Sequence, residues 1–165
     1  GISSFKIEGR IRPPEYVKTT VSCYRRAIDA VNSGEFTQKL ALALKDELKK
    51  AYNRGFSQGF YKGLENGWIS EGPAVRESKE YLGEAVNYYK KVSVAEFLIR
   101  SKSLNVGDKI LVYGKTTPAE YSVVDEIQVN HESVLSVSKG ERCGIKLPFV
   151  VRPGDKLFLV KDSVE

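Results

Sequence analysis

Three charged side chains near the start of the sequence, Lys6, Glu8 and Arg10, could perform acid–base or electrostatic chemistry. They alternate with Phe5 and Ile7, and a period of two predicts a β-strand. Because the working residues of α/β barrels lie where strands end and loops begin, the three charges are candidate catalytic groups at an active-site mouth. A salt-bridged strand end without a chemical role explains the same residues equally well.

A second stretch, residues 54–63, offers binding chemistry. It combines three glycines that free the backbone, three aromatic rings and two cations. Rings stack on the bases of single-stranded nucleic acid while cations meet its phosphates, and the same combination can hold an extended peptide. A structural loop whose rings fill a gap in a core is the alternative. The candidate substrate-binding residues are Arg54, Phe56, Phe60, Tyr61 and Lys62.

Metal, redox and nucleophile chemistry have little support in the sequence. A zinc site needs three or four closely arranged ligands, but the chain has one histidine, His131, and two cysteines, Cys23 and Cys143. Neither cysteine belongs to a Cys-x-x-Cys pair. We therefore predict no metal site and no cofactor in this chain. Two cysteines cannot build a disulfide framework, so a cytoplasmic location is expected.

The excess positive charge is confined to the first half of the chain. Residues 1–79 hold 14 Lys and Arg against 9 Asp and Glu, whereas residues 80–165 hold 12 of each. This excess favours an anionic partner such as RNA, although a solvated lysine-rich helix surface explains it as well. No apolar run reaches the roughly 18 residues that span a bilayer, so no membrane partner is expected.

Residues 4–33 have the pattern of a strand, a loop and a helix. The helix opens at Pro13-Pro14 and ends at Asn32-Ser33-Gly34. Its two adjacent apolar stripes predict contact with more than one neighbour. A second helix is expected from about Thr37, a plausible N-cap, to Tyr52. The first apolar stripe contains Val17, Val21, Tyr24, Ile28 and Val31; the second contains Tyr16, Thr20, Cys23, Ala27 and Ala30.

Short β segments separated by turn signals follow from Tyr81 onward and predict a closed or nearly closed antiparallel barrel. Residues 105–110 and 152–157 resemble each other, since each has a Gly-Asp turn followed by a strand. The predicted fold class is α+β, with a βα segment and helices in residues 1–70, a linker over 71–80 and a barrel over 81–165. The expected strands are 81–89, 92–100, 109–113, 121–128, 133–138, 143–147 and 156–161.

A lone strand of parallel type needs neighbours on both sides. We therefore expect residues 4–33 to end a larger α/β domain. The sequence begins at Gly1 and contains no Met, so we expect it to be part of a longer polypeptide. Phe5 and Ile7 are expected to pack on the barrel or on a second copy, forming a homodimer through the N-terminal strand.

Two segments resemble peptidase family U32, the collagenase-like proteases. Residues 5–10, followed by 14–17 and Tyr24-Arg25, are similar to the end of the family's conserved domain, and residues 53–63 to a segment soon after it. The β-rich tail resembles the accessory barrel of many members, which is similar to the second domain of translation elongation factors. The motif residues that carry over are Lys6, Glu8, Arg10, Asn53, Arg54, Gly55, Phe56, Gly59, Phe60 and Tyr61.

The resemblance implies a peptidase as the parent protein, with a protein or peptide substrate. Similar proteins hydroxylate bases in RNA and use a four-cysteine iron–sulfur site. The cysteine signature of the family lies upstream of residues 5–10, so we expect any cluster there and no activity of this chain alone. We expect a C-terminal accessory module that recruits substrate. The RNA-binding portion of an RNA-base hydroxylase, or a plain oligomerisation module, are the alternatives.

Overall fold

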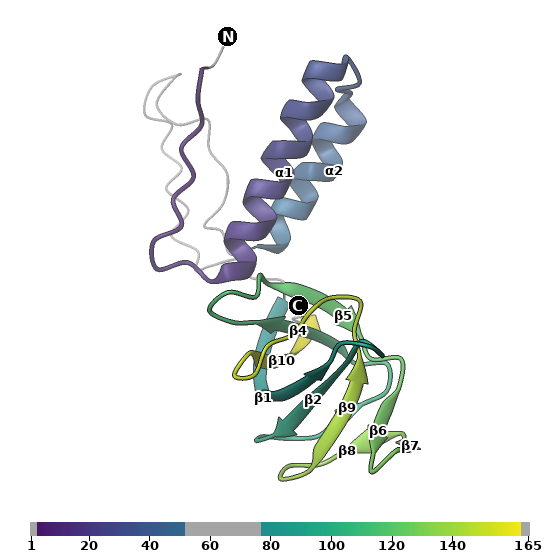
Figure 1. Ribbon diagram of the computed structural model, residues 1–165. Coiled ribbons are helices and arrows are strands. Elements are labelled where there is room, and N and C mark those ends of the chain that lie inside the picture. The colour runs from purple at the N-terminus through teal and green to yellow at the C-terminus, as the bar shows by residue number, and fades with distance from the viewer. Residues whose placement is uncertain (1–2, 52–76, 163–165) are drawn as a thin grey trace. The chain divides into compact units, whose positions relative to one another are not determined.

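The computed structural model describes residues 3–51 and 77–162 (Figure 1). The chain divides into two compact units, residues 1–77 with 163–165, and residues 78–162. In the described residues the first unit contains two helices and the second a β-sheet structure. This arrangement confirms the predicted α+β class. Of the predicted linker 71–80, residues 77–80 belong to a strand and the others lie outside the described residues.

Both predicted helices are present. Helix α1, Pro14–Ser33, has proline in its first turn and ends at Gly34, whose φ of 75° is left-handed. Helix α2, Gln38–Lys50, begins after Thr37, whose hydroxyl accepts a 3.2 Å hydrogen bond from the Leu40 N–H. It ends two residues before the predicted Tyr52. Neither helix is long and apolar enough to cross a membrane.

Only one of the two apolar stripes of α1 is covered in the described residues. Thr20, Cys23 and Ala30 are buried where α1 contacts α2, which contributes the buried Leu44. A 2.6 Å ion pair between Arg26 and Glu47 also joins the two helices. The other stripe remains accessible, with Val21, Tyr24 and Val31 exposed by 46%, 39% and 60%. The short second helix covers one stripe and leaves its neighbour open.

The predicted strand over residues 4–10 is wrong. Residues 3–9 have no regular secondary structure, and a turn follows in which the Arg12 N–H donates to the Gly9 carbonyl. A strand requires a hydrogen-bonded neighbour, and the described residues supply none here. Phe5 lies instead 5.5 Å from the ring of Tyr24, centroid to centroid, and stays half exposed. The homodimer expected through this segment remains a prediction.

Residues 78–162 form a curled antiparallel sheet, as the strand pattern predicted (Figure 1). Its eight strands lie in the order β5-β4-β10-β1-β2-β9-β6-β7, and β3 pairs with β8 in a separate small sheet. The strands are β1 Glu77–Tyr89, β2 Val94–Ile99, β3 Leu104–Asn105, β4 Lys109–Tyr113, β5 Glu120–Val123, β6 Ile127–Val129, β7 Glu132–Val134, β8 Ser136–Val137, β9 Arg142–Lys146 and β10 Lys156–Asp162.

Three strand predictions need correction. The expected strand 121–128 is two strands, β5 and β6, because the chain leaves one edge of the sheet at Val124 and re-enters beside β9. The expected strand 133–138 divides into β7 and β8, since β8 leaves the main sheet to pair with β3. Strand β3 itself was not predicted. Strands this short contain too few residues for an alternation of apolar and polar side chains to be recognised in the sequence.

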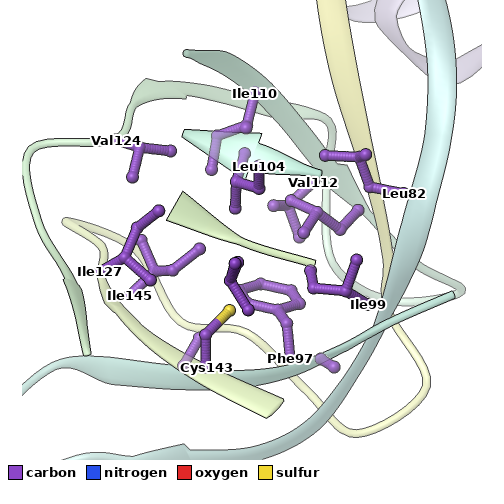
Figure 2. Packing of buried hydrophobic residues seen from close by; sticks show 14 of the residues in the cluster. Leu82, Phe97, Ile99, Leu104, Ile110, Val112, Val124, Ile127, Cys143 and Ile145 are labelled. Carbon is purple, nitrogen blue, oxygen red and sulfur yellow. The ribbon is translucent and has the colours of Figure 1, made fainter. Parts of the chain in front are cut away.

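The curled sheet encloses a large apolar core, seen in Figure 2, and a smaller cluster around Leu111 and Phe158 lies apart from it. The core forms because side chains alternate between the two faces of each strand. Every second residue of β2 is buried, and Cys143 and Ile145 of β9 point inward. Fully burying one large aliphatic side chain stabilises a fold by about 1.5–3 kcal/mol, so this cluster is the main stabilising contact of the unit. Its members include Leu82, Phe97, Ile99, Leu104, Ile110, Val112, Val124, Ile127, Cys143 and Ile145.

The two predicted Gly-Asp turns, 105–108 and 152–155, have the same geometry, and 138–141 repeats it. In each turn the third residue is a glycine, with φ of +91°, +94° and +87° in chain order. The carboxylate of the fourth residue accepts a hydrogen bond from the backbone N–H of the first, at 2.8, 2.6 and 2.8 Å. Each turn therefore uses a glycine for its left-handed backbone and an acidic side chain whose hydrogen bond closes the turn.

We expect Gly154→Ala to lower the free energy of unfolding by about 1–3 kcal/mol, because alanine must adopt a left-handed backbone at a φ of +87°. No atom lies within 4 Å of the added methyl group, so the loss reports backbone strain alone. Urea denaturation measures it. Gly154→Asn is the control, since asparagine tolerates this conformation better. Equal losses for both variants would contradict the strain argument.

Candidate functional site

The three candidate catalytic residues lie in the segment before α1. Lys6, Glu8 and Arg10 are all exposed, and the Arg10 backbone N–H donates a 2.8 Å hydrogen bond to Glu8 Oε1. This contact is local and closes a small loop. A catalytic role for the three residues remains a prediction. The predicted substrate-binding residues Arg54, Phe56, Phe60, Tyr61 and Lys62, with the rest of the 53–63 motif, lie outside the described residues.

Both cysteines are buried thiols. Cys23 lies between the helices and Cys143 inside the barrel. Burial, with the nearby Glu47 carboxylate, raises the pKa of Cys23 to about 11. Burial, with Glu141 and Glu96, raises the pKa of Cys143 to about 12. Because the thiolate is the reactive form, neither cysteine is equipped as a nucleophile at neutral pH.

We expect the folded chain to resist alkylation by iodoacetamide at pH 8, and the urea-unfolded chain to take up two labels, as intact mass spectrometry will report. The neutral thiols favour the fold fully below the ordinary pKa of 9.0, and this contribution is lost as the pH rises towards 11 and 12. The free energy of unfolding should therefore fall above pH 9. Rapid labelling of the native chain at pH 8 would contradict this assignment.

Metal ligands do not converge in the described parts of the chain. Across residues 3–51 and 77–162, no three His, Cys, Asp or Glu side chains lie close enough to hold a metal ion. His131 is exposed in the two-residue turn between β6 and β7, where Asn130 and His131 both have positive φ. This is the turn position that the sequence predicted.

The outer face of the barrel carries a groove of about 590 Å³ that the sequence analysis did not predict. It lies over strands β2, β9 and β6, which are neighbours in the sheet. The lining mixes aliphatic side chains with polar and charged ones. The lining residues are Tyr89, Val92, Val94, Glu96, Glu126, Gln128, His131, Gly144 and Lys146.

Strand register explains the hollow. Gly144 on β9 lies directly between Glu96 on β2 and Gln128 on β6. A glycine in the middle of this row leaves the floor without a side chain. A methyl group added to Gly144 would meet Val94 Cγ1 at 3.1 Å, so the space above it is narrow and bounded by Val94. Glycine within a strand often marks such a close approach, and this was the available sequence signal.

The two carboxylates of the groove are held differently. Glu96 accepts a 3.0 Å hydrogen bond from the Tyr89 hydroxyl at Oε2, and Arg142 lies 3.2 Å from Oε1. Glu126 accepts hydrogen bonds from the Ser133 hydroxyl and the Gln128 amide. These bonds, with the nearby Lys146 charge, lower the pKa of Glu126.

The groove combines polar and apolar groups. Its lining residues supply hydrogen-bonding groups of both kinds and an aliphatic wall, but they include no Ser, Thr or Cys that could act as a nucleophile. A concave site with a few placed polar groups and apolar walls is typical of ligand recognition. The described residues therefore define a two-part chain: a helical hairpin and a barrel-like β-sheet unit that carries a groove on its outer face.

Comparison with known proteins assigns the family. The family model described as Peptidase family U32 matches residues 1–68. An uncharacterized protease of Methanocaldococcus jannaschii is 44% identical over 98% of this chain and 40% of its own length. A collagenase of Porphyromonas gingivalis is 38% identical over 96% of this chain and 39% of its own length. The chain belongs to peptidase family U32, as the residues 5–10 motif indicated.

The chain is also similar to a further curated protein and to a solved structure. A tRNA hydroxylation protein P1 of Bacillus subtilis is 30% identical over 69% of this chain and 27% of its own length. A solved structure of the C-terminal domain of a Geobacillus thermoleovorans putative U32 peptidase covers 48% of this chain and 91% of its own, with a TM-score of 0.46 and 15% identity. The chain spans about two fifths of the length of the curated proteases it matches.

Proposed function

We propose that the chain is the C-terminal portion of a U32 peptidase. In this proposal its barrel, residues 78–162, is a non-catalytic module that recruits a polypeptide substrate in the outer groove. The observation that carries the proposal is the groove itself, a hollow of about 590 Å³ lined by the aliphatic side chains of Val92 and Val94 together with polar groups. Lys6, Glu8 and Arg10 would then act in the peptidase body rather than in this module.

An extended polypeptide suits the groove better than a compact ligand. Val92 and Val94 offer an apolar surface for the side chains of an extended chain. Tyr89, Gln128 and His131 provide donors and acceptors that peptide groups require. The similarity to proteases covers the barrel as well as the helices, since it extends over at least 96% of the chain.

Binding of fluorescein-labelled denatured casein to the chain, followed by fluorescence anisotropy, tests this role. Gly144→Gln places a side chain on the groove floor and should weaken binding at least about fivefold, which corresponds to about 1 kcal/mol. Val123→Gln, on the exposed face of β5, is the matched control and should leave binding unchanged. Circular dichroism verifies that both variants are folded.

Two results would overturn the proposed role. One is an unmodified chain that does not bind the casein probe. The other is a folded Gly144→Gln variant that binds it as tightly as the unmodified chain, because the groove would then not be the site of contact.

RNA binding by the first half of the chain is the second candidate. The net positive charge of residues 1–79 and the similarity to tRNA hydroxylation proteins favour it. The similarity to the proteases is closer and covers more of the chain, so the peptidase role is preferred. In this second candidate the basic helices hold phosphates and the 54–63 stretch holds bases.

A gel-shift experiment with a tRNA transcript decides on the RNA candidate. If it holds, affinity should fall steeply as salt rises, because bound phosphates release counterions. Arg54→Ala and Phe56→Ala should each weaken binding further. An unmodified chain that leaves tRNA mobility unchanged at low salt removes this candidate.

A further inference from the structure

We propose that Glu96 sets the specificity of the groove by binding the cationic end of an arginine or lysine side chain in the recruited polypeptide. That ligand cation takes over the contact with Glu96 that the chain's own Arg142, which does not line the groove, makes in the free chain. The inference rests on the proposed function, because it assumes that the ligand is a polypeptide.

Glu96 lines the groove, and its carboxylate is positioned to bind a cation. Its side chain is only 20% exposed, and Glu96 is paired with Gly144 of the neighbouring strand β9. The Tyr89 hydroxyl fixes its orientation through the hydrogen bond to Oε2. A largely covered carboxylate requires a charged partner, because burial removes its hydration.

Arg142 is the charged partner of Glu96, but its contact with the carboxylate is weak. Its side chain is 61% exposed, and a single guanidinium nitrogen reaches Glu96 Oε1 at 3.2 Å. Such a contact lacks the two parallel hydrogen bonds of a strong arginine–carboxylate pair. Because exposed ion pairs contribute little stability, a ligand cation that approaches along the floor can displace this guanidinium.

The second carboxylate does not compete for the same cation. Glu126 is held by the Ser133 hydroxyl and the Gln128 amide, and the nearby Lys146 charge compensates it. The aliphatic wall formed by Val92 and Val94 lies in the same groove as Glu96. That wall can contact the methylene groups of an arginine or lysine stem while the charged end meets Glu96.

Two labelled peptides of identical extended sequence, one with a single arginine and one with citrulline in its place, provide the test. Citrulline keeps the shape of arginine and lacks its charge. Anisotropy titration should show that the arginine peptide binds about tenfold more tightly to the unmodified chain. Glu96→Gln should remove this preference, because the amide keeps the side-chain size and the contact with Tyr89 but not the charge.

Arg142→Gln should act in the opposite direction and tighten binding of the arginine peptide about two- to fivefold, since the internal competitor is gone. A merely structural ion pair would make both variants weaker binders. Arg100→Gln is the matched control: Arg100 forms a comparable exposed pair with Glu84, 2.7 Å apart, and Glu84, unlike Glu96, does not line the groove. Its loss should leave both peptides unaffected.

The outcomes separate this inference from the proposed function. Equal binding of both peptides, or weaker arginine-peptide binding by a folded Arg142→Gln variant, would overturn the role of Glu96 while leaving substrate recruitment intact. Failure of both peptides and of labelled casein to bind the unmodified chain would instead remove the recruitment role, and the inference with it. Thermal melts verify that each variant is folded.

Discussion

The apolar interior of the curled sheet determines which side chains its outer surface can present. Because side chains alternate across a strand, burial of Cys143 and Ile145 forces Gly144 and Lys146 of β9 outward. The same constraint turns Glu96 outward on β2 while Phe97 enters the core. A one-residue slip in either strand would reverse these faces and bury a carboxylate, so the packing of the core also fixes the groove.

The groove illustrates how a surface hollow can arise without a sequence motif. Its walls come from strands far apart in the chain, and only the pairing of β2 with β9 and of β9 with β6 brings Glu96, Gly144 and Gln128 into one row. The acidic turns at 105–108, 138–141 and 152–155 support this arrangement at the strand ends.

Local chemistry in the sequence was sufficient to predict the helices and most strands. Gly34 and Thr37 mark helix boundaries through their own backbone and side-chain hydrogen bonds, which need no distant partner. The strand expected over residues 4–10 was wrong for the converse reason. Alternation of Phe5 and Ile7 with charged residues indicates a face, but a strand exists only where another strand accepts its hydrogen bonds.

The sequence by itself determined the α+β class, the helix caps, the turn positions and the family. These features depend on residues close together in the chain, or on motifs such as residues 5–10. Only the tertiary structure decided which stripe of α1 is covered, and which outward side chains of β2, β6 and β9 become neighbours. Those choices depend on strand order and register, which the long-range packing of the barrel core selects and a local pattern does not encode.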